Sequence, residues 1–113
     1  MNNSILNTIK EMMGIEIEET AFDNDIIVHI NTVFFILNQL GVGPTEPFII
    51  RDEYATWDNF ISDSTNLESI KTYMYLKVKL LFDPPQSSSH VEALKQSASE
   101  FEWRLNLVAE SET

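Results

Sequence analysis

The spacing of hydrophobic and polar residues predicts an α-helix at the start of the chain and a second, more apolar helix after it. Residues 4–13 place their apolar side chains on one face of a helix, and Gly14 is suited to end it. Residues 25–40 are apolar around most of the helix circumference, which is typical of a buried central helix. Asp23 or Asn24 is expected to cap this second helix. The stretch between the two helices, residues 15–21, alternates apolar and acidic residues and is expected to be a linker, with a short edge strand as the alternative.

Residues 41–66 are the least regular part of the chain, because prolines and glycines interrupt any periodic pattern. We expect a very short strand at 48–50, then a one-turn helix that Thr56 caps and that packs Trp57 against the core. Connections of this length are uncommon in compact domains and are often functional. Two interpretations stay open. This arm, residues 41–66, either binds a partner or forms an irregular cover packed on the helices.

The third main helix is predicted over residues 67–82. Thr65 and Glu68 have the spacing of a capping box, in which side chain and backbone bond reciprocally in the first turn. The predicted core-facing stripe consists of Leu67, Ile70, Met74, Val78 and Leu81. Tyr73 and Tyr75 widen this stripe beyond what one partner helix needs, which indicates a further contact surface.

A turn enforced by proline follows the third helix. The turn residues are Asp83, Pro84 and Pro85. Proline disfavours helical geometry in the residue before it, and two prolines in a row lack the amide donors that a helix needs. One of the serines at 87–89 is expected to cap the last helix, which then lies antiparallel to the third. The turn is expected to set where Leu81 and Phe82 meet the first turns of the last helix.

The last helix, predicted over residues 89–109, has two apolar faces when about 100° is allowed per residue. The side expected to face the core holds Val91, Leu94, Ala98, Phe101, Leu105 and Val108. Trp103 and Leu107 point the other way, among polar side chains. Because an exposed apolar pair often marks an interface, we expect these two residues to contact another molecule. The alternative is that the N-terminal helix or the arm covers them.

Length and patterning together predict one small helical domain. The chain has 113 residues, which is typical of a single domain. We expect an all-α fold over residues 1–113, a bundle of about four helices with a long irregular connection between the second and third main helices. It comprises an N-terminal helix at 1–14 and the arm. Neither a signal peptide nor a membrane span is expected, because the longest apolar run is short and interrupted by polar residues.

Charge and residue types limit the chemistry. A net charge of −11 repels nucleic-acid phosphates, so sequence-specific DNA binding is not expected. The acidity either keeps the protein soluble or forms a surface that meets a basic partner or that DNA must not adhere to. The chain has no cysteine, and His29 and His90 lack the spacing of a metal motif. Since no catalytic triad or phosphate-binding loop stands out either, we expect no catalytic residues, metal, cofactor or enzymatic activity.

The chain resembles the small head–tail connector proteins of tailed bacteriophages, also called adaptor or head-completion proteins. The segments that carry the resemblance are AFDNDIIVHINTVFFILNQLGVGP, ATWDNFISD, IKTYMYLKVKLLFDPP and EALKQSASEFEWRLN. They cover most of residues 21–107 in the order expected of that family. The most distinctive part is YLKVKLLFDPP followed by a helix that ends in EWRLN.

The resemblance implies a structural virion protein of the neck, at the head–tail junction, that resides in the host cytoplasm during assembly. Such proteins form a ring, commonly of twelve copies, beneath the portal protein. The ring extends the DNA channel, through which DNA passes without specific binding, and docks a stopper or tail-completion protein. The family often contacts the portal through a long C-terminal extension, whereas only AESET follows the predicted last helix here. We expect the arm or the N-terminal helix to make that contact instead.

Particular residues are candidates for these roles. The candidate subunit or partner interface consists of Trp103, Leu107, Tyr73, Tyr75, Trp57 and Phe48. The candidate acidic wall of the channel consists of Glu16, Glu18, Glu19, Asp23 and Asp25. The proline turn is expected to be structural. The alternative function is a small acidic regulatory protein that binds and masks a basic partner.

Overall fold

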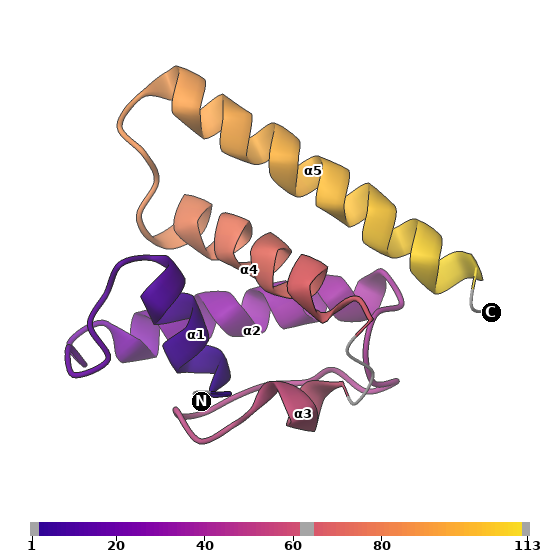
Figure 1. Cartoon of the computed structure of the whole chain (residues 1–113), viewed down its shortest axis with the longest axis horizontal. Helices are drawn as coiled ribbons and strands as arrows, with labels where there is room; N and C mark the ends of the chain where they lie inside the picture. The colour runs from indigo at the N-terminus through magenta and orange to yellow at the C-terminus, as the bar shows by residue number, and fades with distance from the viewer. Residues whose placement is uncertain (1–2, 62–64, 112–113) are drawn as a thin grey trace.

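The computed structural model describes residues 3–61 and 65–111, which form a small all-α bundle (Figure 1). The helices of this described part are α1 (Ile5–Met12), α2 (Asp23–Gln39), α3 (Trp57–Phe60), α4 (Leu67–Phe82) and α5 (Ser88–Ser111). The arm connects α2 to α4 and contains the single turn of α3; its residues 62–64 lie outside the described part. The predicted fold class, with its long irregular connection, is confirmed.

The helices pack in layers, with α4 in the middle. One side of α4 contacts α2 and α1, and the other side contacts α5. Figure 1 shows α5 along one edge of the subunit and the arm with α3 along the opposite edge. The prediction that the second helix is the buried central one is therefore wrong. Although α2 buries residues such as Ile30 and Leu37, its outer side leaves Val28 and Phe35 60% and 53% exposed.

Glycines end the first two helices as predicted. Gly14 and Gly41 have φ angles of 78° and 85°, in the left-handed region that glycine adopts without strain. After Gly14, the Ile15 amide donates to the Lys10 carbonyl at 2.8 Å and closes the last turn of α1. The end of α2 has the same arrangement. Both chain reversals therefore follow from local sequence.

Helix starts are predicted less well. The N-cap of α2 is Phe22, without a side-chain cap bond, and Asp23 is the first helical residue. Asp23 does not cap because its carboxylate is drawn to Lys10, at 2.8 Å. The N-cap of α4 is Asn66, one residue after the expected Thr65, and its side chain makes no cap bond. At α5 the serine prediction is confirmed, because the Ser87 hydroxyl accepts a hydrogen bond from the His90 amide at 3.3 Å.

The arm is held on α2 by asparagine side chains. The Asn31 amide group donates to the Ile50 carbonyl at 3.0 Å and accepts from the Ile50 amide at 2.8 Å. Asn38 donates to the carbonyls of Pro44 and Thr45 at 3.3 and 3.1 Å. The expected strand at 48–50 is wrong within the described residues, because a side chain of α2 satisfies the backbone that a neighbouring strand would have paired.

Side chains of the arm also enter the core. Ile50, Trp57 and Phe60 are buried, and the ring of Phe60 lies 4.7 Å from that of Phe34 on α2. These residues of the arm therefore form an irregular cover packed on the helices, which was one of the two interpretations of the sequence. A partner-binding role for the remaining, exposed surface of the arm stays a prediction.

Asn31→Ala is expected to lower the free energy of unfolding by about 1–3 kcal/mol, because it leaves the polar backbone of buried Ile50 without its partners. Hydrogen exchange should speed up at the Ile50 amide and along the arm. Thr32→Ala is the control: Thr32 is exposed on the same helix, and we expect a change within about 0.5 kcal/mol. Equal effects of both substitutions would mean that Asn31 does not fasten the arm.

The turn between α4 and α5 lies where the proline pair predicts it, immediately after Phe82. Its packing differs from the expectation, however. The Phe82 ring contacts Phe22 and His29, with ring centroids 5.7 and 6.2 Å apart, so it packs toward α2 and not toward α5. Leu81 was expected in the core-facing stripe and is exposed instead. Leu81 lines an open hollow between α4 and α5, together with Val91 and Ala98, so α5 does not cover it.

Candidate functional site: two assembly surfaces

The outer face of α5 carries the largest exposed aromatic side chain of this helix. Ala98 and Leu105 are buried against the rest of the protein, whereas Trp103 and Leu107 are 63% and 43% exposed. The predicted two-sided character of this helix is thus observed. We call Trp103, Arg104 and Leu107 the α5 outer face. Its role as an interface stays a prediction.

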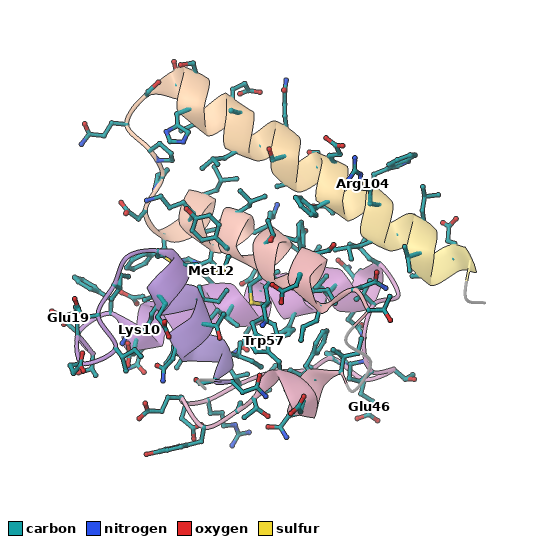
Figure 2. All side chains as sticks on the ribbon, viewed as in Figure 1. Lys10, Met12, Glu19, Glu46, Trp57 and Arg104 are labelled. Carbon is teal, nitrogen blue, oxygen red and sulfur yellow. The ribbon has the colours of Figure 1, made fainter. Side chains whose placement is uncertain are left out.

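Arg104 adds a positive charge to this face. Figure 2 shows Arg104 on α5, at the side of the subunit away from the arm. Its guanidinium pairs with Glu100, one helical turn earlier, and both side chains are exposed. Exposed pairs of this spacing contribute only about 0.3–0.5 kcal/mol, so Arg104 can exchange Glu100 for another carboxylate at little cost.

A second surface is a hollow that we call the acidic cleft, with a volume of about 640 Å³. It is lined by Gly14, Ile15, Glu16, Glu19, Phe22, Asp25, Phe82 and Asp83. Its floor is aromatic, because Phe22 is half exposed and meets Phe82 edge to face. Carboxylates from three segments of the chain form its rim. A hollow with an apolar floor and an acidic rim is suited to a side chain, or a pair of side chains, that is both apolar and positively charged.

Lys10 holds the loop that forms one wall of this cleft. Its side chain is fully buried, and its ammonium donates to the carbonyls of Ile17 and Glu19 at 2.9 and 2.7 Å. The same ammonium lies 2.8 Å from Asp23 Oδ1 at the start of α2. Figure 2 shows Lys10 beside this loop, with Glu19 at its outer edge. One lysine therefore ties α1, the loop and α2 together.

Sequence reasoning missed Lys10, although a signal existed. The residue lies four positions after Leu6, so it falls within the apolar face of α1 and not on its solvent side. A lysine at such a position is buried only when charged or polar groups surround its ammonium. The acidic and backbone-rich stretch that follows α1 supplies those groups.

The candidate acidic residues separate into two kinds. Glu16, Glu18, Glu19 and Asp25 are exposed, as expected for a charged wall. Asp23 is partly buried and paired with Lys10, so its charge is balanced inside the subunit. Three exposed members also line the cleft, and Glu18 does not. The prediction that these carboxylates face a DNA channel is carried forward as a proposal.

Tyr73, a candidate interface residue on α4, is buried where this helix packs against α5. Its hydroxyl donates to Glu102 Oε2 at 2.7 Å, and Lys77 lies 4.0 Å from the same carboxylate. Burial raises the pKa of the Tyr73 hydroxyl, and the hydrogen bond to Glu102 and the negative charge of that residue raise it further. The hydroxyl therefore stays protonated and links the two helices.

The other aromatic candidates also lie inward. Trp57 is fully buried, and its indole N–H donates to Thr8 Oγ1 at 3.1 Å. Phe48 is half-buried, with its ring 5.0 Å from that of Phe34, and Tyr75 is half-buried against the core. In the isolated subunit, the structure therefore brings Trp103 and Leu107 together on the surface and places Trp57 and Tyr73 inside.

Within the described residues, no group of three or more His, Asp and Glu side chains is arranged to hold a metal ion. None of the helices in that part of the chain has the length and apolar character needed to cross a membrane.

Comparison with known families identifies the chain. The family model described as phage connector protein matches residues 5–112. No curated protein and no solved structure matches the chain. The family match extends from the first residue of α1 to beyond the last residue of α5, and so includes both the α5 outer face and the acidic cleft. The chain belongs to the phage connector protein family, which indicates a structural role in connecting the head and tail of a phage particle.

Proposed function

We propose that this protein is a head–tail connector subunit that forms a ring, commonly of twelve copies, beneath the portal. The ring extends the DNA channel and docks a stopper or tail-completion protein. The observation that carries the proposal is the presence of two unlike exposed surfaces, the α5 outer face and the acidic cleft. Family membership supports the location at the head–tail connection of the particle.

A cyclic ring requires two different surfaces on each subunit, because every contact joins the head of one copy to the tail of the next. A symmetric dimer, by contrast, uses one self-complementary surface. The two surfaces of this subunit differ in shape and charge: one is a protruding helix face with an arginine, and the other is a hollow with an acidic rim. They are suited to head-to-tail assembly and not to pairing of like with like.

Contact with the portal or the stopper is proposed through the arm. Ile49 and Tyr54 extend from it and are exposed, although their neighbours Ile50 and Trp57 are buried. Anchored backbone beneath exposed apolar side chains offers a docking surface that loses little conformational freedom on binding. The arm lies along the edge of the subunit opposite α5, so it remains accessible when α5 packs in a ring (Figure 1).

The acidic loop is proposed to face the channel. Charge reversal to lysine at Glu16, Glu18, Glu19 and Asp25 is expected to slow DNA packaging or ejection, because phosphates would then adhere to the wall. Asp23 is left unchanged because it pairs with Lys10.

The matched control is charge reversal of another set of exposed acidic residues, which changes the net charge equally. This set consists of Glu11, Glu68, Glu92 and Glu110, which lie outside the arm and do not line the acidic cleft. Assembled particles with the loop variant should release DNA more slowly than particles with the control. Equal rates would count against a channel wall, and failure of only the loop variant to assemble would assign the loop to a subunit contact.

The test of the proposed function is the place and copy number of this chain in purified particles. Quantitative mass spectrometry should find it in particles at a number that matches the portal, and electron microscopy should show a ring at the neck. Absence from particles, together with a small stoichiometric complex with a basic protein, would favour the acidic regulatory protein instead.

A further inference from the structure

We propose that the α5 outer face of one copy inserts into the acidic cleft of the next copy, and that this contact closes the ring. Trp103 and Leu107 cover the aromatic floor, and Arg104 meets the carboxylates of the rim. The inference rests on the proposed ring and identifies the partner of each surface as a second copy of this chain.

Shape and apolar character favour this pairing. The cleft has a volume of about 640 Å³, within the range of about 300–1,000 Å³ typical of sites that bury a ligand of modest size. Phe22 is half exposed at its floor, and Trp103 is 63% exposed on α5. Tryptophan and arginine are the residues most often found at the energetic centre of an interface, and here they are adjacent in sequence. Contact would remove both exposed aromatic side chains from water.

Charge also favours the insertion of the α5 outer face into the acidic cleft. Among the described side chains, Lys79 lies 3.0 Å from Asp83, and no cation pairs with the rim carboxylates of Glu16, Glu19 and Asp25. The Lys79–Asp83 pair balances one rim charge, and the three remaining carboxylates leave the rim strongly negative. Arg104 leaves an exposed partner on its own helix and gains carboxylates in a more enclosed place, where an ion pair is less screened.

The two surfaces are placed as head-to-tail assembly requires. Figure 2 shows Glu19, at the rim of the cleft, and Arg104, on the α5 outer face, at well-separated positions on different sides of the subunit. The view is down the shortest axis of a body of 40 × 35 × 23 Å, so this separation runs along its longer dimensions. One subunit can therefore hold two neighbours at once. If this contact forms, Glu16, Glu19 and Asp25 lie at the subunit boundary and only Glu18 remains for the proposed channel wall. The loop variant with all four charges reversed should then fail to assemble, which is the outcome that assigns the loop to a subunit contact.

Paired cysteines test the contact directly, because the natural chain has none. The double variant Glu19→Cys/Leu107→Cys is treated with a short bis-maleimide while assembled with the portal. If the α5 outer face lies in the cleft of the next copy, each molecule is joined to two neighbours, and a covalent ladder of trimers and larger species results. Each single variant can give dimers at most. Adding Arg104→Glu to the double variant should reduce the ladder at least several-fold.

A competing position for the α5 outer face is the outer side of α2, where Val28 and Phe35 are exposed. The pair Thr32→Cys/Leu107→Cys samples it, because Thr32 lies between those residues on the same side of α2. A ladder from this pair but not from Glu19→Cys/Leu107→Cys would overturn the proposal. So would rings seen by electron microscopy in which neither pair forms a ladder, and that result would leave the proposed function standing. If no ring and no ladder form with portal present, both proposals fail.

Discussion

An unfolding free energy that falls by about 3 kcal/mol is the expected result of Lys10→Met. Removing one partner of a buried ion pair costs about 3–5 kcal/mol, because the remaining charge is left without compensation. The value for Lys10 should lie toward the lower end, since the Asp23 side chain is 23% exposed and regains some water. Methionine keeps a similar volume in the apolar face of α1, so the loss is electrostatic and does not come from a cavity. The carbonyls of Ile17 and Glu19 lose a donor at the same time.

Denaturant titration of the purified subunit measures this loss, and a matched lysine provides the control. Lys79 also forms an ion pair, at 3.0 Å from Asp83, but on the surface, so Lys79→Met should change the unfolding free energy by about 1 kcal/mol or less. Adding Asp23→Asn to Lys10→Met should recover part of the loss, because it removes the uncompensated charge. Similar losses for Lys10→Met and Lys79→Met would show that the buried pair does not stabilise the fold.

The Lys10 substitution also connects stability with assembly. Its ammonium is the group that holds the loop of Glu16 and Glu19 against the start of α2, and this loop forms a wall of the acidic cleft. We expect faster hydrogen exchange in the loop before global unfolding, and weaker ring formation than the stability loss alone would cause. Lys10 is buried and makes no contact with the next copy in the proposed ring. Substituting it should nevertheless weaken assembly, because the acidic cleft needs this lysine to keep its shape.

The parts of the fold that the sequence predicts correctly are those with strong local signals at both ends. The predicted bounds of the third helix coincide with those of α4, because the proline pair that follows Phe82 cannot continue a helix. The exposure of Trp103 and Leu107 follows from helical periodicity alone, since α5 packs on one side only. Local rules suffice where one element meets one neighbour.

The features that the sequence does not predict arise from contacts between distant segments. Lys10 looks like a surface residue until the following loop folds back over it. The acidic cleft joins residues from the loop, from α2 and from the end of α4, and no single stretch carries its pattern. The Asn31 side chain satisfies backbone groups of the arm. The sequence of that extended segment, considered alone, predicts a strand instead. Tertiary contacts decide each of these cases.

The two tryptophans of the chain should respond in opposite ways to substitution by alanine. Trp57→Ala is expected to lower the free energy of unfolding by about 3–5 kcal/mol, because it empties the fully buried site where the arm packs against α1 and removes the donor to Thr8. Trp103→Ala should change it by about 0.5 kcal/mol or less, since its side chain is 63% exposed. Thermal and denaturant unfolding followed by circular dichroism measure both values.

Assembly should show the reverse order, and this separates an interface residue from a core residue. Trp103→Ala should abolish or strongly weaken ring formation while helicity stays near that of the natural protein. At a temperature where Trp57→Ala is still folded, rings of that variant should form, because Trp57 is fully buried and does not reach the subunit surface. Loss of folding with Trp103→Ala would instead make Trp103 part of the core. Normal rings with Trp103→Ala would show that α5 is not part of the subunit contact. The predicted result, by contrast, assigns the stability of the subunit to Trp57 and the contacts of the ring to Trp103.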